Sequence, residues 1–255
     1  MVIIQKKARI AQLTFIPFMF CLFWYLLTLL KIVNPLFIPS PGAVANTFFK
    51  LILSVEMWAN TGATSLRMLV GFFIASLIAI PIGVFLGRYR SAYLFCEFFI
   101  DFTRSIPATS LFPLFLLILG VGNESKIAMV AFSCFFVILI NSIYGVWNSP
   151  KTRILIAKTF RASQLQMLLK IILWDALPDI FAGLRNALSI ALILAVVSEM
   201  FVGTNSGLGF LIFNAKISYD TGKMYAIIIF LGILGYATNR FLLFFENRVI
   251  PWARA

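Results

Sequence analysis

The chain has 255 residues, of which 62% are hydrophobic, 16% aromatic and only 12% charged. Its mean hydropathy is +1.00, and its charged fraction is about half that of an ordinary soluble domain, which excludes a soluble globular protein. The 21 Lys and Arg against 9 Asp and Glu give a net charge of +12. Because no stretch is polar enough to form a basic face in water, we expect these cations at membrane edges and not on nucleic acid.

Residue types that carry chemistry are scarce. The sequence has no His, which removes the commonest metal ligand and the general base most used near neutral pH. Cys21, Cys96 and Cys134 lie in apolar runs, at spacings that fit neither a disulfide framework nor a metal site. The phosphate-binding loop GxxxxGK[ST] is absent from the sequence. We therefore expect no catalytic residue, no metal and no cofactor in this chain, and predict that it is not an enzyme.

Six apolar segments are long enough to cross the hydrocarbon core as helices. They cover residues of about 11–30, 62–87, 92–120, 126–147, 179–202 and 223–245. Residues 42–55 follow three closely spaced prolines and have apolar residues at helical spacing, which predicts a helix on the outer surface. We expect an all-α polytopic membrane helix bundle that forms a single transmembrane domain over residues 1–255.

The basic residues predict the orientation of this bundle, because cytoplasmic loops are enriched in Lys and Arg. With six spans, both termini lie on one side. Placing them in the cytoplasm puts Lys6, Lys7, Arg9, Arg88, Arg90, Lys151, Arg153, Lys158, Arg161, Lys170, Arg240, Arg248 and Arg254 there, and Lys31, Lys50, Lys126, Lys216 and Lys223 outside. Arg67, Arg104 and Arg185 fall within or at the ends of spans and do not enter this comparison. The asymmetry predicts cytoplasmic N- and C-termini.

Polar residues at membrane depth are the candidates for a pathway or gate, since ionisable groups in hydrocarbon are costly without a partner or a cavity. Asp101 and Arg104 can pair on one helix face, just before Pro107, where the helix must kink or break. This pair fits a structural role as well as a pathway. Glu199 precedes glycine-rich backbone, which predicts an irregular or re-entrant segment. The candidate set is Asp101, Arg104, Pro107, Ser198, Glu199, Gly203 and Gly207.

Two glycines in the second span, Gly83 and Gly87, form a GxxxG pair that would let another helix approach closely. The neighbouring helix can belong to this chain or to a second subunit. The sequence favours packing within the chain and leaves a subunit contact open.

The largest cytoplasmic segment, residues 149–174, carries two helix starts. Ser149 before Pro150 predicts an N-cap with proline in the first turn, and Ser163 with Gln166 three residues later predicts a capping box. A helix, a turn near residues 161–163 and a second helix follow. The second helix has an apolar stripe, which needs either the chain's own bundle or a soluble subunit as its partner. The stripe consists of Leu165, Leu168, Leu169 and Ile172.

An ordered series of short motifs runs through almost the whole chain. It reads IPSPGAV at 38–44, SLRMLVGF at 65–72, IPIGVFLG at 80–87, RSIPATSLFPL at 104–114, AGLRNAL at 182–188, VVSEM at 196–200 and SGLGFLI at 206–212, with a similar ending over 239–252. With these motifs the chain resembles the permease subunits of ATP-binding-cassette (ABC) importers, in the branch for taurine, alkanesulfonates, nitrate and bicarbonate.

The resemblance implies a type I ABC importer permease in the inner membrane of a bacterium. Such a subunit forms the translocation pathway for a small, anionic solute such as a sulfonate, nitrate or bicarbonate. It is expected to pair with a second copy or a homologous permease, to receive solute from an extracytoplasmic binding protein, and to rest on two cytoplasmic ATPase subunits through a coupling helix. ATP hydrolysis is then expected in the separate ATPase subunits.

The family's coupling motif, EAA followed by three residues and Gly, is degenerate here. The resemblance assigns ATPase coupling to Leu155, Ile156, Ala157, Phe160 and Arg161, with Arg161 in place of the glycine. This departure leaves open an asymmetric pair in which another permease keeps the standard motif, an altered ATPase partner, or a non-transporting permease-like scaffold. An ion-driven secondary carrier is a further alternative, and would have to use Asp101 or Glu199.

Overall fold

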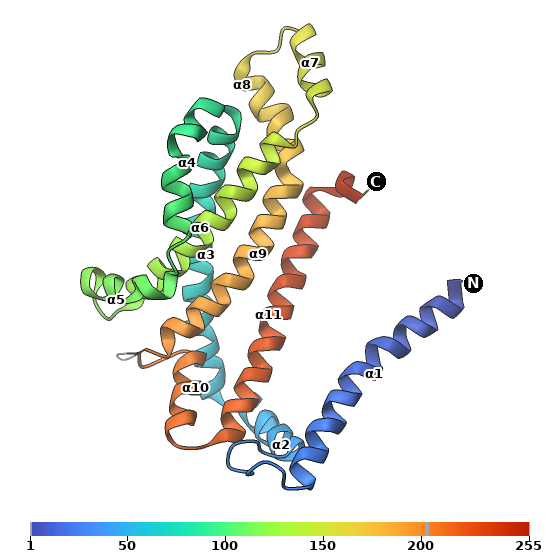
Figure 1. Cartoon of the computed structure of the whole chain (residues 1–255), viewed down its shortest axis with the longest axis vertical. Helices are drawn as coiled ribbons and strands as arrows, with labels where there is room; N and C mark the ends of the chain where they lie inside the picture. The colour runs from blue at the N-terminus through green and yellow to red at the C-terminus, as the bar shows by residue number, and fades with distance from the viewer. Residues whose placement is uncertain (1, 202–203, 255) are drawn as a thin grey trace. The chain divides into compact units, whose positions relative to one another are not determined.

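The computed structural model describes residues 2–201 and 204–254, and the regular structure in them is entirely helical (Figure 1). The all-α prediction is confirmed. The elements are α1 (Val2–Leu29), α2 (Pro41–Ile52), α3 (Val55–Arg88), α4 (Arg90–Arg104), α5 (Ala108–Leu119), α6 (Asn123–Trp147), α7 (Lys151–Thr159), α8 (Gln164–Met167), the π-helical η1 (Leu168–Ile172), α9 (Leu173–Glu199), α10 (Leu208–Ile217), α11 (Thr221–Val249) and the 3₁₀-helical η2 (Pro251–Arg254).

Four helical runs among the described residues are long and apolar enough to cross a membrane: α3, α6, α11 and the run Gln164–Glu199. Helices α4 and α5 provide a fifth span if they are taken together. The first expected span falls on α1, whose apolar stretch is Phe18–Leu29. The bundle therefore has four to five apolar spans, and the sixth span and the location of the termini stay predictions.

The predicted interruption before Pro107 is confirmed. Helix α4 ends at Arg104, α5 begins at Ala108, and the two helices are bent by 89°. Pro107 is the N-cap of α5 with φ −61°. Because proline has no backbone N–H and clashes with the preceding turn, it ends α4 and starts a helix in a new direction.

The second helix of the cytoplasmic segment and the following span, expected as separate elements over 149–174 and 179–202, form one helical run. Elements α8, η1 and α9 continue from Gln164 to Glu199 over 36 residues. The sequence has no glycine between residues 164 and 182 to end the helix. Pro178 lies inside α9, and the π-helical turn η1 shortly before it changes the helical register.

One predicted cap is confirmed and one is wrong. Ser163 Oγ accepts a hydrogen bond from the Gln166 N–H at 3.2 Å, and Gln166 Oε1 accepts one from the Ser163 N–H at 2.9 Å, which is the capping box. Ser149 does not cap α7, whose N-cap is Pro150. The Ser149 hydroxyl instead donates to the carbonyl of Gly145 at 3.4 Å, because a serine after a helix can bond back to the carbonyl four residues earlier.

The chain divides into two compact units. The first contains Met1–Trp58 and Leu211–Leu231. In it, Trp24 Nε1 donates to the Pro39 carbonyl at 3.1 Å, and the Trp24 and Tyr225 rings lie 5.9 Å apart. Lys223 pairs with Glu56 at 3.3 Å. The second unit contains Ala59–Phe210 and Gly232–Ala255, and it holds the candidate sites that follow.

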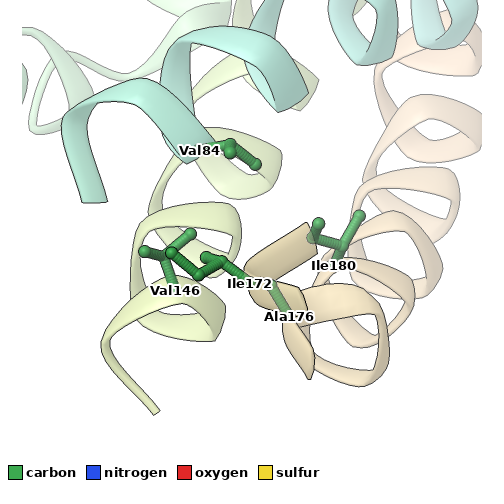
Figure 2. Packing of buried hydrophobic residues seen from close by; sticks show 5 residues of the cluster. All are labelled: Val84, Val146, Ile172, Ala176 and Ile180. Atoms are coloured by element: carbon green, nitrogen blue, oxygen red, sulfur yellow. The ribbon is translucent and has the colours of Figure 1, made fainter. Parts of the chain in front are cut away.

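Helices α3, α6 and α9 form the core of the second unit. A Cβ atom on Gly83 would lie 2.5 Å from the Cβ of Ser142, and one on Gly87 would lie 2.7 Å from the Cβ of Val146. The GxxxG pair therefore packs against α6 of the same chain, as the sequence favoured. Figure 2 shows one layer of this core, where Val84 of α3, Val146 of α6 and residues of η1 and α9 converge. The η1 and α9 residues are Ile172, Ala176 and Ile180.

Candidate functional site

A buried ion pair in the second unit joins Arg67 of α3 to Glu199, the last residue of α9. Arg67 Nη1 lies 2.6 Å from Glu199 Oε1, and the two side chains are 5% and 0% exposed. Burying either charge alone in an apolar bundle costs several kcal/mol, so each of them needs the other.

Each charged group has further hydrogen-bond partners, and those among residues 2–201 and 204–254 are all neutral groups. Glu199 Oε2 accepts from Thr64 Oγ1 at 2.8 Å and from the Gly209 N–H at 3.0 Å. Arg67 Nε donates to Asn123 Oδ1 at 2.8 Å, while its Nη atoms donate to the carbonyl and hydroxyl of Ser206 at 2.8 and 2.9 Å. The pair thereby ties α3 to the start of α6 and to the segment after α9.

The same face of α3 holds the segment after α9 through its backbone. Asn60 Oδ1 accepts a hydrogen bond from the Gly207 N–H at 2.6 Å, and Thr64 Oγ1 accepts one from the Leu208 N–H at 2.8 Å. We call this set the Arg67–Glu199 cluster. It consists of Asn60, Thr64, Arg67, Asn123, Glu199, Ser206, Gly207, Leu208 and Gly209.

Two glycines of the cluster are required by its geometry. Gly207 has φ +119°, and a Cβ atom there would lie 2.2 Å from the carboxyl carbon of Glu199. A Cβ atom on Gly209 would lie 2.1 Å from the Val196 carbonyl oxygen. Any larger residue at either position would displace the carboxylate or the end of α9.

The candidate gate residues divide between this cluster and other places. Glu199 and Gly207 belong to the cluster, whereas Ser198 is buried beside it and donates to the Ala195 carbonyl at 2.7 Å. Gly203 lies outside the described residues. The segment was expected to be irregular, and residues 204–207 between α9 and α10 are indeed not helical.

Asp101 and Arg104 form the predicted ion pair, with Nε of Arg104 at 2.8 Å from Oδ1 of Asp101 and both side chains about half exposed. Neither residue of this pair hydrogen-bonds to a member of the Arg67–Glu199 cluster within residues 2–201 and 204–254. Arg104 and Pro107 line a cavity of 340 Å³ at the break between α4 and α5. Its other lining residues include Ala108, Phe132, Ser133 and Phe136.

The residues assigned to ATPase coupling occupy α7 and the turn after it (Figure 1). Leu155, Ile156 and Phe160 are exposed, Phe160 to 82%, whereas Ala157 is buried. Ile156, Ala157 and Phe160 line a groove of 680 Å³ together with residues of η1, α9 and η2. The groove also contains the ion pair between Arg153 and Asp175 and the ring contact between Trp174 and Trp252, whose centroids lie 5.6 Å apart.

The turn at Arg161 is a Schellman motif formed without glycine. Arg161 has φ +55°, its N–H donates to the Lys158 carbonyl at 3.0 Å, and the Ala162 N–H donates to the Ala157 carbonyl at 3.0 Å. Arg161, which stands where the family's coupling motif has glycine, thus has the strained left-handed conformation that glycine adopts freely. Such a conformation costs an L-residue about 1 kcal/mol or more.

Sequence reasoning missed the partner of Glu199. The orientation comparison excludes Arg67 as a span residue and assigns Lys126 to the outer side, and neither assignment predicts what these side chains contact. Lys126 is buried, and its ammonium donates to the carbonyls of Val121 and Gly122 at 3.2 and 3.0 Å. The available signal was one Arg and one Glu, each alone in an apolar run, since buried charges of opposite sign are expected to pair.

No group of three or more His, Cys, Asp or Glu side chains in residues 2–201 and 204–254 could hold a metal ion. The candidate sites can therefore be described by ion pairing, hydrogen bonding and shape within that part of the chain.

Comparison with known proteins agrees with a transport role. Residues 79–251 match the family described as binding-protein-dependent transport system inner membrane component. A putative ABC transporter permease protein of Methanocaldococcus jannaschii is 33% identical over 98% of this chain and 95% of its own length. The putative aliphatic sulfonates transport permease protein SsuC of Bacillus subtilis is 29% identical over 93% and 86%, and the taurine transport system permease protein TauC of Escherichia coli is 27% identical over 90% and 85%.

A solved structure supports the fold. A chain of the MetNI methionine ABC transporter, in an inward facing conformation, superposes with a TM-score of 0.65 at 20% identity, over 76% of this chain and 96% of that one. The type I importer permease fold expected from the motifs is thereby confirmed. Since the family match covers more than half of its residues, this chain belongs to the binding-protein-dependent transport system inner membrane components, the permease subunits of ABC importers.

Proposed function

We propose that this permease moves a small organic anion of the sulfonate class inward, driven by ATP hydrolysis in separate cytoplasmic subunits. The relatives named for aliphatic sulfonates and taurine support this substrate class. The chain itself needs no cofactor in this scheme. It contributes the pathway, a gate and a surface for the ATPase.

The observation that carries the proposal is the exposed apolar surface of α7. Leu155 and Ile156 of α7 and Phe160, the residue that caps its C-terminus, are exposed, and this nine-residue helix lies outside the apolar spans. Burying one such side chain contributes about 1.5–3 kcal/mol, so a surface of three favours a protein partner over water. Arg161 adds a cation at the end of this helix, which suits an acidic groove on that partner.

The Arg67–Glu199 cluster is the proposed gate. It fixes the segment after α9 to α3 and α6 through a buried ion pair and backbone hydrogen bonds. A gate needs an arrangement that is stable when closed and that separates as a unit when it opens. If Glu199→Gln leaves both solute uptake and the coupled ATPase rate of the assembled complex unchanged, the gate assignment is wrong.

A permease-like scaffold that holds a complex together without transport is the second candidate. The replacement of the coupling glycine by Arg161, with its left-handed backbone, is the observation that favours it. The two candidates differ in solute uptake: both bind partner subunits, but only the permease supports ATP-dependent uptake.

Copurification tests the coupling surface. The tagged chain is extracted from its native membrane in mild detergent, and an ABC-type ATPase is expected to copurify in a fixed ratio. Phe160→Ala should lower ATPase recovery at least fivefold, at unchanged yield of the permease. Leu53→Ala is the control, because Leu53 is an equally exposed leucine, 86% accessible, that follows α2 and belongs to the first compact unit, whereas the coupling segment belongs to the second. Absence of an ATPase from the wild-type sample, or equal recovery with Phe160→Ala, would contradict the proposal.

A further inference from the structure

The break between α4 and α5 opens onto the 340 Å³ cavity described above. The cavity lies beside the middle of a membrane span, because its residues Phe132, Ser133 and Phe136 stand near the centre of α6. Broken helices at mid-membrane are tolerated where they line a cavity, and they recur as binding sites in transporters.

Three groups that border this cavity, Arg104, Ser133 and the N-terminus of α5 at Ala108, have hydrogen-bond donors without a full set of partners. Ser133 Oγ is buried and has no hydrogen-bond partner in the described residues. Arg104 uses Nε for Asp101, and neither of its terminal nitrogens has a hydrogen-bond partner among residues 2–201 and 204–254. Helix α5 starts at Ala108 behind Pro107, and no side chain caps it.

These donors all favour a negatively charged oxygen as their acceptor. A helix N-terminus carries a partial positive charge and free N–H groups, and a guanidinium presents paired N–H groups that match an oxyanion. A buried hydroxyl without a partner is unfavourable, and an incoming acceptor would remove this cost. The remaining wall is apolar and includes Phe132, Phe136 and Ile190, which suits the hydrocarbon part of an organic anion.

We infer that this cavity is a transient binding site for the anionic head group of the transported solute, held by Arg104, Ser133 and the N-terminus of α5. The inference rests on the proposed function and adds the side chains that would recognise the solute. The volume is at the lower end of small-molecule pockets, in keeping with a short sulfonate. Asp101 neutralises part of the Arg104 charge, which keeps binding weak enough for release, as conduction requires.

Saturation-transfer NMR on the full chain in phosphatidylcholine nanodiscs tests the site with ethanesulfonate as the probe. Ethyl methyl sulfone, of similar size and uncharged, is the reference. The wild-type chain should bind the sulfonate and not the sulfone. Arg104→Gln should weaken sulfonate binding at least tenfold, and Ser133→Ala about threefold, in line with the difference between charged and neutral hydrogen bonds.

Two control variants match these substitutions. Arg90→Gln removes a cation from α4 that does not line the cavity, and Ser142→Ala removes a buried hydroxyl of α6 that already donates to the Ile138 carbonyl. Both should bind ethanesulfonate like the wild type. Ser133→Ala removes an unpartnered hydroxyl and should fold normally, so a loss of binding in this variant reports on the site.

Equal binding by wild type, Arg104→Gln and Ser133→Ala, or equal binding of sulfone and sulfonate, would overturn the inference. ATP-dependent uptake by the assembled transporter separates this result from failure of the proposed function. Sulfonate uptake without sulfonate binding in the cavity refutes the site alone. A transporter that imports only uncharged or cationic solutes refutes the proposed substrate class, whatever the cavity binds.

Discussion

Arg67 and Glu199 are 132 residues apart in the sequence, yet their side chains form a buried ion pair with an N to O distance of 2.6 Å. Both groups are surrounded by neutral donors and acceptors from α3, α6 and the segment after α9. The pair therefore acts as the polar centre of an otherwise apolar packing of helices, and its removal should affect several elements at once.

Glu199→Gln should lower the stability of the folded chain by about 3–5 kcal/mol, because it leaves the Arg67 charge buried without a counter-ion. The melting temperature in detergent, followed by tryptophan fluorescence, checks this. Asp101→Asn is the control, since it breaks an ion pair that is about half exposed and should cost about 1 kcal/mol or less. The double variant Arg67→Gln with Glu199→Gln should recover part of the loss. Similar melting temperatures for Glu199→Gln and Asp101→Asn would show that the buried pair contributes little.

Gly83→Ala should destabilise the chain much more than Gly62→Ala, although both glycines lie in α3. A Cβ atom on Gly83 would meet the Leu139 carbonyl oxygen at 2.8 Å as well as Ser142, while one on Gly62 has no atom within 4 Å. Forcing α3 and α6 apart typically costs about 1–3 kcal/mol, whereas alanine in an open helical position gains up to about 1 kcal/mol in helix propensity. The stability of both variants is measured by the ratio of monodisperse to aggregated protein after heating. An equal loss of stability for the two variants would contradict the prediction that the close approach of α3 to α6 at Gly83 makes this position the more sensitive one.

Arg161→Gly should strengthen the turn after α7 by about 1 kcal/mol, because glycine adopts the left-handed conformation without strain. Hydrogen exchange of the amides of residues 161 and 162, which close this turn, should slow by about fivefold.

In contrast, Arg161→Glu should release the ATPase in detergent extracts while leaving permease yield unchanged. Undiminished ATPase recovery with Arg161→Glu would refute the contact, and loss of the permease itself would show that the residue serves the turn.

Single-cysteine labelling checks the predicted topology. In a background without the native cysteines, Gln5→Cys and Arg254→Cys should react with a membrane-impermeant maleimide only after cell lysis. Lys50→Cys and Lys216→Cys should react in intact cells. The expectation follows from the excess of basic residues assigned to the cytoplasmic side. Labelling of either terminus from outside would reverse or invalidate the orientation.

Features with short sequence spacing could be predicted. The Ser163 and Gln166 capping box, the Asp101 and Arg104 pair and the break before Pro107 each depend on residues within four positions of one another. At that distance helical geometry alone decides which side chains meet. The apolar segments were predicted for a similar reason, since span length follows from bilayer thickness.

Features that depend on the packing of distant segments could not be predicted. Nothing in helical periodicity assigns Arg67 to Glu199, because several helices and loops separate them. The burial of Lys126 depends on the path of the backbone between α5 and α6, where Val121 and Gly122 supply the acceptors. The coupling groove depends on η1, since a π-helical turn changes which residues of the following helix face α7.

Uptake into proteoliposomes shows whether this chain is the permease of an ATP-driven importer for small organic anions. The chain is reconstituted with its copurified ATPase and its extracytoplasmic binding protein, and accumulation of radiolabelled taurine or ethanesulfonate is followed with ATP present on the cytoplasmic side. We expect accumulation that requires ATP and the binding protein and that is lost when Phe160→Ala detaches the ATPase. Assembly of the complete complex without uptake of any small anion would contradict it and favour the scaffold.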